Sequence, residues 1–485
     1  MGPNKGPAGP AVGVVPEQER YGTMKENPEP VVGGAEPRGT GRQPVGEPRE
    51  TAVKNVFVFG LNDFNRSLME RMPGAAGYNF IPLVPNEEVE EPEHYDIDAI
   101  MADAEAQLDT FDGPIDAIVG YIDIPVGTIL PILGRKYGVP TPSLESVLKC
   151  QHKYWSRVEQ AQVIPEGVPR FARFDPFDDD PLAHIALDFP FWIKPVKSAG
   201  SFLGFRIDSR QQFYDKLALI RAEIGRLSEP FNRLLQFADL PADMAEVDCH
   251  YCIAEEIIGG HQCTLEGFVF DGEVSIYGVL DSVRYPESSA FLRYEYPSRL
   301  PQPVQARMAD LTARALARIG LDTSVFNVEF FWDEAADKIG LLEINTRISQ
   351  SHSDLFHNVD GASNHLAMVD IGLGRKPRMP YRRGAFACSA KWYCRRFADA
   401  YVEAIPAPRD IAAVQARFPE ARVRINVKPG IRLSSLVEQD SYSFDLAWIF
   451  LGGADTPDLE RRYRETLDLL PFRFSEGPSG PAIND

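Results

Sequence analysis

Apolar and polar residues follow one another in short runs that predict a mixed α/β protein. The earliest clear run is KNVFVFGLNDFNRSL (54–68), where a β-rich apolar stretch leads into a glycine, polar capping residues and a helical pattern. That order is typical of the first unit of a parallel α/β sheet. Two more strands are expected at 79–84 and 116–122, and YGVPTP (137–142) ends the unit.

The most apolar run of the chain, 115–133, is predicted to be a strand, a loop and a helix. Asp116, Asp123 and two prolines interrupt it, whereas a membrane-spanning helix needs about 20 largely apolar residues in succession. We therefore expect no membrane partner.

The pattern changes three more times along the chain. A helix is predicted at 143–162, with Ser143 as its N-cap. Strands, helices and turns then alternate up to residue 375, and the last hundred residues combine strands with two helices, at 409–418 and 457–470. The predicted division is a Pro- and Gly-rich disordered tail, an α/β domain, a central domain and a small α+β domain, at 1–50, 51–142, 143–375 and 376–485.

Length, composition and charge indicate a soluble protein of several domains. A length of 485 residues suggests about three domains, and 44% hydrophobic with 25% charged residues is typical of a soluble globular protein. The net charge of -20 argues against nucleic-acid binding, which depends on lysine and arginine. Six cysteines form no disulfide framework, and the first fifty residues lack an apolar signal region, so a cytoplasmic location is expected.

Cys249 and Cys252 form a CxxC sequence within VDCHYCIAEEII. This stretch is predicted to be a strand, in which residues three apart point to opposite faces. The spacing therefore argues against a metal or redox site.

Candidate chemistry is concentrated in FNVEFFWDEAADKIGLLEINTRIS (326–349), where two strands flank a polar turn of hairpin length. Side chains alternate along a strand, so Asn327 and Glu329 share one face of the first strand. Glu343 and Asn345 share one face of the second. Carboxylate and amide oxygens can therefore converge between the paired strands.

Glu329, Glu343 and Asn345 make a ligand set suited to Mg²⁺, or to Mn²⁺ in its place, because Mg²⁺ prefers one or two carboxylates with phosphate oxygens and water. Arg347 continues the same period and can reach an anion held by the metal. The alternative is a surface hairpin with ordinary polar residues. Acids inside apolar runs are costly to bury without partners, which favours the metal.

FWIKPVKSAGSFLGFRI (191–207) places Lys194 at the end of an apolar strand and a small-residue loop directly after it. A lysine is a point charge that suits phosphate, and the backbone N–H groups of such a loop can fold over phosphates. No GxxxxGK[ST] motif is present, so this is not a P-loop. A plain hairpin turn is the alternative.

A third element is CIAEEIIGGHQCTLEGFVFDGEV (252–274), in which a strand ends in acids, two apolar residues and two glycines before a second strand. Such a segment can offer backbone groups to an adenine edge and a carboxylate to the ribose or the exocyclic amine. Its alternative is an ordinary β-turn.

Taken in order, these elements and Lys153 resemble the ATP-grasp superfamily over about residues 54–375, and the specific part is E-x-N-x-R at 343–347 preceded by Glu329. The resemblance implies a fold class of α/β and α+β. It comprises a Rossmann-like domain before the nucleotide site, an ATP-grasp domain of two α+β subdomains, and a small C-terminal α+β domain.

The resemblance also implies roles for individual residues. Lys153 and Lys194 would contact the ATP phosphates, and the loop from Ser198 to Gly204 would close over them. The remaining assignments are adenine contacts at Glu255, Glu256 and Ile258, loop contacts at Gly200 and Ser201, and metal ligands at Glu329, Glu343 and Asn345. Arg347 would steady the transferring phosphoryl group. Where many relatives have a glutamate for the ribose, this chain has Gln262, or His261 if the alignment shifts by one.

The implied reaction is ADP-forming: a carboxylate attacks the γ-phosphorus of ATP to give an acylphosphate, and an amine then displaces phosphate. The expected partners are thus a small-molecule carboxylate and amine, and a homodimer stays open. Two other functions also stay open, a biotin-carboxylase-like carboxylase and a catalytically silent ATP-binding regulatory protein.

The substrate side is expected in VLDSVRYPESSAFLRYEYPSRLP (279–301), predicted to be a loop excursion. Arginine can clamp a carboxylate with two hydrogen bonds, and Arg284 is the first choice as a catalytic residue. The other candidates in this stretch are Arg293, Tyr294, Tyr296 and Arg299. Ser351, His352 and His357 follow Arg347 closely, and His352 is a candidate acid or base, or a packing residue.

Overall fold

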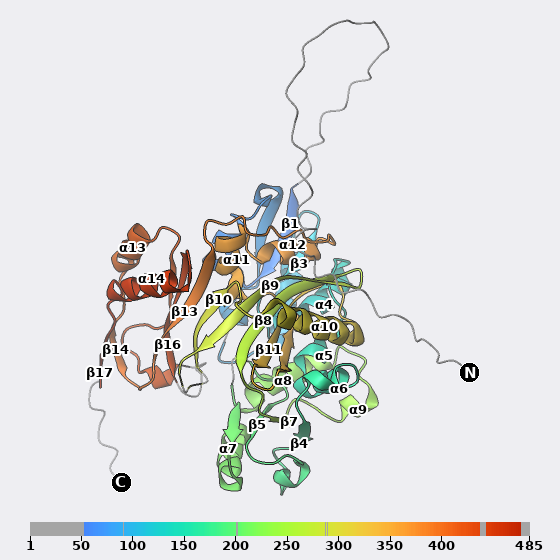
Figure 1. The fold of residues 1–485 in the computed structure, drawn as a ribbon. Coiled ribbons are helices and arrows are strands. Elements are labelled where there is room, and N and C mark those ends of the chain that lie inside the picture. Colours follow the sequence, from blue (N-terminus) through green and yellow to red (C-terminus); the bar gives the residue numbers. More distant parts are fainter. Residues whose placement is uncertain are drawn as a thin grey trace, which may run out of the picture.

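The computed structural model describes residues 53–90, 92–199, 202–286, 288, 290–436 and 443–476. The predicted tail at 1–50 lies outside these residues. Figure 1 shows a parallel sheet at one end of the molecule, a small antiparallel sheet at the other, a large sheet between them, and the C-terminal helices at one side. No helix within the described ranges is long and apolar enough to cross a membrane.

The first sheet is parallel, as the sequence predicts, with the order β2-β1-β3. Its strands are β1 (Lys54–Phe59), β2 (Tyr78–Leu83) and β3 (Ala117–Val119). Four helices accompany them: α1 (Asp63–Met69), α2 (Asn86–Val89), α3 (Ile97–Asp109) and α4 (Val126–Tyr137). The run at 115–133 thus folds as a strand, a loop and a helix, as predicted.

The helix predicted at 143–162 is two helices, so that prediction was wrong in this detail. They are α5 (Leu144–Gln151), capped by Ser143 as expected, and α6 (Lys153–Ala161). The break is at His152, which leaves the helical conformation and accepts a hydrogen bond from the backbone N–H of Trp155. A new helix therefore begins at Lys153, whose own N–H donates to the carbonyl of Val196.

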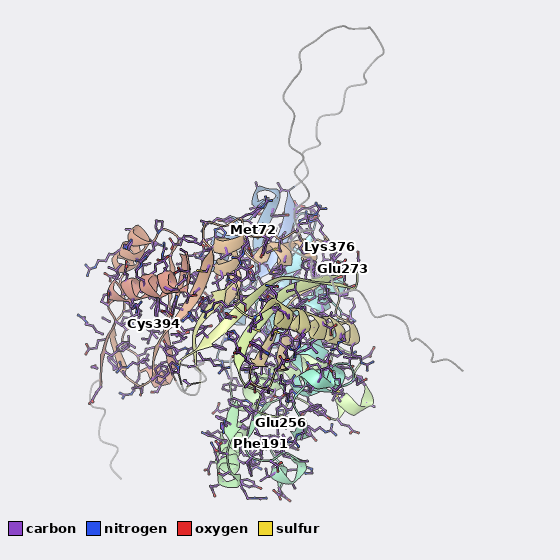
Figure 2. The ribbon with its side chains drawn as sticks, viewed as in Figure 1. Met72, Phe191, Glu256, Glu273, Lys376 and Cys394 are labelled. Atoms are coloured by element: carbon purple, nitrogen blue, oxygen red, sulfur yellow. The ribbon has the colours of Figure 1, made fainter. Side chains whose placement is uncertain are left out.

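The small antiparallel sheet has the order β4-β7-β5-β6. Its strands are β4 (Phe171–Phe174), β5 (Phe191–Pro195), β6 (Phe205–Ile207) and β7 (Cys252–Glu256), and its helices are α7 (Arg210–Glu223), α8 (Gly225–Leu235) and α9 (Ala242–Ala245). Phe191 and Glu256 are directly paired here (Figure 2). The strand predicted through Cys249 begins only at Cys252, because residues 248–250 form a turn. Both cysteines are buried and free.

The central sheet has eight strands in the order β12-β11-β8-β9-β10-β13-β16-β15. The five that precede residue 375 are β8 (His261–Phe270), β9 (Glu273–Arg284), β10 (Phe291–Tyr296), β11 (Ser324–Asp333) and β12 (Lys338–Asn345). The helix α10 (Gln302–Ile319) packs on one face, where it buries alternate residues such as Leu265, Val328 and Phe330. Polar residues alternate with them and face the other way.

The stretch at 279–301 is a strand pair and not the predicted loop excursion. β9 and β10 pair in antiparallel fashion up to Arg284. The aromatic and aliphatic residues at alternate positions explain the pairing, because such residues favour strands. Because side chains alternate along a strand, the candidate substrate residues of 279–301 lie on both faces of the sheet.

The sheet continues across residue 375 into the C-terminal part. β13 (Cys388–Arg396) pairs with β10, and β16 (Phe444–Gly453) and β15 (Arg422–Ile425) follow. The two predicted C-terminal helices are present as α13 (Pro408–Arg417) and α14 (Thr456–Asp468), and they cover the face that carries Trp392 and Ile449. A separate pair, β14 (Tyr401–Ala404) and β17 (Arg473–Ser475), completes this part.

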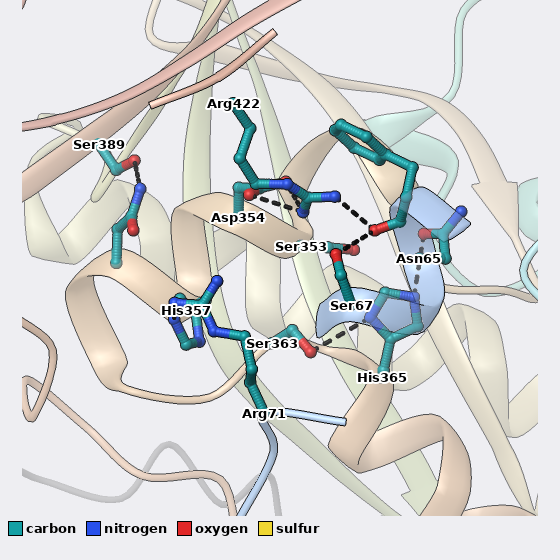
Figure 3. A network of polar contacts seen from close by, with 12 residues as sticks. Asn65, Ser67, Arg71, Ser353, Asp354, His357, Ser363, His365, Ser389 and Arg422 are labelled. Atoms are coloured by element: carbon teal, nitrogen blue, oxygen red, sulfur yellow. Dashed lines mark hydrogen bonds and ion pairs between the residues drawn. The ribbon is translucent and has the colours of Figure 1, made fainter. Parts of the chain in front are cut away.

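Two short helices, α11 (Ser353–Asp360) and α12 (His365–Gly372), join the three parts of the chain (Figure 3). Arg422 of β15 forms an ion pair with Asp354 of α11 at 2.9 Å and also donates to the carbonyl of Phe64 in α1. His365 of α12 lies 3.2 Å from the side-chain oxygen of Asn65. Segments far apart in sequence are thereby held together beside the central sheet.

Candidate functional site

The central sheet presents a polar face that is built by strand register. Glu329 on β11 lies opposite Glu343 on β12 and opposite Thr264 on β8. Two residues further along, the same three strands place Asn327 opposite Asn345 and opposite Glu266. Because directly opposed residues share a face, the predicted ligand trio, Glu329, Glu343 and Asn345, is brought together.

Glu329 and Glu343 titrate differently although they are neighbours. Burial and the charge of Glu343 raise the pKa of Glu329 to about 7. Burial acts against ionisation of Glu343 as well, but Lys153 outweighs it and lowers the pKa of Glu343 to about 2. The Lys153 ammonium lies 2.8 Å from a Glu343 oxygen. Lys153 therefore compensates one of the two carboxylates.

Asn345 is oriented by a chain of amides. Its side-chain NH₂ donates to the Oδ1 of Asn327 at 3.0 Å, and Asn327 in turn donates to the backbone carbonyl of Arg347 at 3.2 Å. The Oδ1 of Asn345 is therefore the end that can serve as a ligand. Two acids and one amide oxygen fit Mg²⁺. The described residues contain no group of three His, Cys, Asp or Glu that could hold a metal.

Beside this face, Lys194 and Glu255 of the small sheet and Arg157 of α6 form a buried cluster of two cations and one acid. The carboxylate of Glu255 accepts from Arg157 at 2.6 Å and from Lys194 at 2.7 Å. Burial alone would raise the pKa of Glu255, but Arg157 and Lys194 lower it to about 2. Burial lowers the pKa of Lys194 despite this partner. Arg157 also donates to the carbonyls of Leu341 and Leu342, which fixes the small sheet against β12.

The loop predicted to cover phosphates, Ser198 to Gly204, follows Lys197, and both Lys197 and Ser198 are buried. Gly204 is also buried and directly precedes β6. Gly200 and Ser201 lie outside the described residues. The described ends of the loop therefore join β5, which carries Lys194, to β6.

Sequence reasoning missed Asp123, which follows β3 in the first sheet. Its carboxylate lies 3.7 Å from the Nζ of Lys197, and its Oδ1 is buried without a hydrogen-bond partner among the described residues. Burial opposes ionisation, but Lys197 and Arg347 lower the pKa of Asp123. An acid at the carboxyl end of a parallel strand was the available signal, since sites in such sheets lie there.

Arg347 lies where the two sheets and β3 approach one another. Its positive charge favours the ionised form of three carboxyl groups, those of Asp123, Glu329 and Glu343. At Glu329 this effect is outweighed by burial and by the charge of Glu343. The candidate site therefore contains Lys153, Lys194 and Arg347 as cations around the acid pair. A site of this composition can hold a polyphosphate together with a divalent cation.

The hinge segment after β7 separates Glu255 from Glu256. Glu255 points into the buried cluster, whereas Glu256 pairs with the exposed Arg170 at 2.7 Å. Ile258 contacts Gly340 of β12, and a cavity of about 370 Å³ is lined by Glu256, Ile257 and Ile258 among others. Gly260 has a φ of +105°, a backbone conformation that favours glycine. A Cβ atom added at this position would lie 2.2 Å from the Trp332 carbonyl oxygen.

Gln262 lies away from the hinge, on the polar face. It donates to a Glu329 oxygen at 3.0 Å and accepts from the Nε and Nη2 of Arg284 at 2.9 and 2.6 Å. Arg284 lies between the rings of Phe291 and Phe331. Burial lowers the pKa of Arg284. The amide of Gln262 thus links the acid pair to the first-choice substrate arginine.

The other candidates of 279–301 point in different directions. Tyr294 shares the polar face, where its ring is 4.9 Å from that of His352. Arg293 points to the opposite face and pairs with Glu295 at 2.8 Å. Tyr296 donates to Asp360 at 2.7 Å, and Arg299 is exposed. Only Arg284 and Tyr294 of this group lie beside the acid pair.

The three candidates that follow Arg347 (Ser351, His352 and His357) contact different parts of the molecule. The Nδ1 of His352 lies 2.6 Å from Glu266, on the polar face. Ser351 accepts from the buried Lys391 at 2.8 Å. His357 points away, toward Arg71 of the first domain at 2.9 Å (Figure 3). Of these three, His352 alone contacts a residue of the polar face described above.

Comparison with protein-family models gives a match to the ATP-grasp domain over residues 187–353. This stretch contains Lys194, the hinge, the acid pair and Arg347, which is the arrangement just described. This part of the chain is an ATP-grasp domain. A comparison with curated proteins gives no match.

Solved structures share the fold of this chain over most of its length. An L-amino acid ligase from Bacillus licheniformis is 16% identical, with a TM-score of 0.63 over 87% of this chain and 99% of the other. A biotin carboxylase from Campylobacter jejuni in complex with ATP is 14% identical, with a TM-score of 0.58 over 87% and 93%. The biotin carboxylase domain of Hydrogenobacter thermophilus 2-oxoglutarate carboxylase, with MgADP and bicarbonate, is 14% identical, with 0.55 over 87% and 91%.

Proposed function

We propose that the chain is an ATP-dependent ligase that joins a carboxylic acid to an amine through an acylphosphate and releases ADP and phosphate. The observation that carries this proposal is the meeting of Lys153 with Glu343 at 2.8 Å. This contact brings a cation suited to phosphate against the acid pair suited to a metal. An ATP-binding protein without chemistry would have no need of Arg347 beyond that pair.

ATP would lie between the small sheet and the central sheet. The hinge at Glu256 and Ile258 would offer backbone groups to adenine, Glu255 would accept from the exocyclic amine, and Lys194 and Lys153 would bind phosphates. Arg157 would hold Glu255 in place. Loop residues Ser198 to Gly204 would cover the phosphates and exclude water, which strengthens the electrostatic interactions inside the site.

Glu329, Glu343 and the Oδ1 of Asn345 would hold Mg²⁺, which neutralises phosphate charge when it is bound. The positive charge of a bound cation would offset the burial and the Glu343 charge that raise the pKa of Glu329. Lys153, which contacts Glu343 at 2.8 Å, would bind a phosphate oxygen. Without the cation, Lys153 favours the ionised form of Glu343, which is the form that binds a metal.

The acid substrate would lie against Arg284, with one carboxylate oxygen directed at the γ-phosphorus. That oxygen forms the new O–P bond while the bond from the γ-phosphorus to the bridging oxygen of ADP breaks. Arg347 would stabilise the negative charge on the transferring group. Arg284 would hold the carboxylate, because a guanidinium between two aromatic rings is poorly hydrated and attracts anions strongly.

The test is ATP turnover with Mg²⁺ in the presence of pooled carboxylic acids and hydroxylamine, with ADP, AMP and hydroxamate measured separately. We expect ADP and hydroxamate in equal amounts, both abolished in Glu343→Ala. The matched control is Glu334→Ala, which removes an exposed carboxylate in the turn between the same two strands. AMP as the product, or ADP formed only with bicarbonate and biotin, would contradict the proposal.

A further inference from the structure

A buried Glu266–His352 pair lies on the polar face next to the acid site. Glu266 is 0% exposed and His352 is 3% exposed. The Nδ1 of His352 is 2.6 Å from one Glu266 oxygen. The proposed function assigns no role to Glu266 and does not use His352, which the sequence offered only as a candidate acid or base.

The contacts of Glu266 determine which nitrogen of His352 carries the proton. One carboxylate oxygen also accepts from the N–H of Ser349 at 3.2 Å, and the other accepts from Tyr277 at 2.8 Å and Asn364 at 3.0 Å. All of these partners are donors, so Glu266 is held as an acceptor. The Nδ1 of His352 therefore donates to Glu266, and in the neutral imidazole the lone pair is then on Nε2.

That Nε2 is buried without a hydrogen-bond partner among the residues that the structure describes, and so is the hydroxyl of Ser282. The two groups flank Tyr294. Its ring is 4.9 Å from the His352 ring, and Ser282 lies directly opposite Tyr294 in the strand pairing. Buried polar atoms of this kind ordinarily have partners. A substrate N–H group that reached the Nε2 of His352 would give that atom the partner it lacks among the described residues.

Register places this pair of acceptors beside the reacting groups. Glu266 lies opposite Asn327, which lies opposite the proposed ligand Asn345. Neighbouring strands are about 4.8 Å apart, so Glu266 is about 10 Å from Asn345 across the sheet. Ser282 in turn lies opposite Gln262, the residue that holds Arg284. His352, which contacts Glu266 and Tyr294, therefore lies on the face of the sheet that also carries Asn345 and Gln262.

We propose that the Nε2 of His352 is the general base that removes a proton from the ammonium group of the amine substrate. This inference rests on the proposed ligase function. The proton moves to Nε2, and Glu266 stabilises the resulting imidazolium. The freed nitrogen lone pair forms the C–N bond with the acyl carbon, the C–O bond to phosphate breaks, and the second amine proton leaves with the phosphate.

The proposal predicts that the two half-reactions depend differently on His352. Acylphosphate formation needs no base, and hydroxylamine is largely unprotonated at neutral pH, so it attacks without help. An amino group is protonated at neutral pH and needs the base. In His352→Gln we expect hydroxamate formation within about twofold of wild type and ligation to pooled amino acids lowered by about 10²- to 10⁴-fold, the range of general-base effects. Ligation should recover as the pH is raised.

Two further variants keep the test decisive. His357→Gln makes the same substitution in a histidine that faces Arg71, and it should leave both reactions unchanged. Glu266→Gln should reproduce the selective loss of ligation, because an amide can hold His352 in the other tautomer. It also serves if His352→Gln fails to fold.

The results separate the two proposals. Wild-type protein that yields neither ADP nor hydroxamate overturns the ligase function and this inference with it. Wild-type protein that yields hydroxamate, together with a His352→Gln variant that ligates at the wild-type rate or loses both reactions equally while folded, overturns the base alone. A purely structural role for His352 predicts the last of these results.

Discussion

Glu329 and Glu343 lie directly opposite each other on β11 and β12, yet their pKa values move in opposite directions. Lys153 forms an ion pair with Glu343. Glu329 instead accepts a hydrogen bond from the neutral amide of Gln262. One acid is therefore compensated, and the other carries the cost of burial and of its neighbour's charge.

The asymmetry predicts opposite stability effects for two isosteric substitutions. The pKa of Glu329 rises from 4.5 to about 7 on folding, so its contribution to stability is full below pH 4.5 and is lost as the pH rises through 7. Without metal or nucleotide, Glu329→Gln should be about 1 to 2 kcal/mol more stable than wild type at pH 8, and this gain should vanish near pH 5.

Glu343→Gln should instead be destabilised at pH 8 by about 1 to 3 kcal/mol, because Lys153 loses its charged partner. The pKa of Glu343 is lowered on folding, so its stabilising contribution is present above pH 4.5 and is lost as the pH falls toward 2. Denaturant titrations at pH 5 and pH 8 measure both variants. Shifts of the same sign at pH 8 would contradict the assignment of Lys153 to Glu343.

The buried cluster around Glu255 predicts a large loss of stability for one of two adjacent glutamates. Glu255→Gln leaves Arg157 and Lys194 buried without a charged partner, and breaking such a pair costs about 3 to 5 kcal/mol. Glu256→Gln removes only an exposed pair with Arg170 and should change the free energy of unfolding little. Free energies of unfolding at pH 7 compare the two, and equal losses would argue against the buried cluster.

The hinge glycines offer a second matched pair. Gly260→Ala places a methyl group 2.2 Å from the Trp332 carbonyl in a backbone conformation that disfavours side chains, which we expect to cost about 1 to 3 kcal/mol or to shift the hinge. Gly259→Ala meets nothing within 4 Å and should change little. Titration with ATP should show weakened binding in Gly260→Ala alone. Normal ATP affinity in a folded Gly260→Ala protein would show that the hinge does not hold the nucleotide.

The sequence predicts the acid hairpin well because the alternation of Glu329 and Glu343 with apolar residues is a local signal with a period of two. Register then follows from the four-residue turn, 334–337, between the strands. The break at His152 was not predicted, because the helical pattern continues through it and the contacts that hold it, to the carbonyls of Val247 and Val196, come from distant segments. The prediction of a loop at 279–301 was wrong: aromatic and aliphatic residues alternate there and form a strand pair, but charged residues lie among them.

Contacts between distant segments were the least predictable part of the candidate site. Asp123 and Lys197 are 74 positions apart and meet only when the first sheet packs beside the small sheet. Arg157 and Glu255 likewise come from separate elements. Such pairs leave no periodic signal in one sequence, so they require the assembled fold.

Arg284 carries the last prediction, on recognition of the acid. Its Nε and Nη2 both donate to Gln262, and its guanidinium lies between Phe291 and Phe331. Arg284→Lys keeps the charge but cannot reproduce this planar, two-point contact. We expect kcat/KM for the acid to fall about 10- to 100-fold with little change in the KM for ATP, as the loss of charged hydrogen bonds implies.

The matched control is Arg299→Lys, because Arg299 is 61% exposed and its Nε is 3.9 Å from Asp281 on the same strand pair. It should leave kcat/KM for the acid within about twofold of wild type, since exposed ion pairs contribute little. Steady-state kinetics with the acid identified from the pool measures both variants. If Arg284→Lys altered the KM for ATP and left kcat/KM for the acid unchanged, Arg284 would belong to the nucleotide side, and the carboxylate would have to be held elsewhere on the polar face.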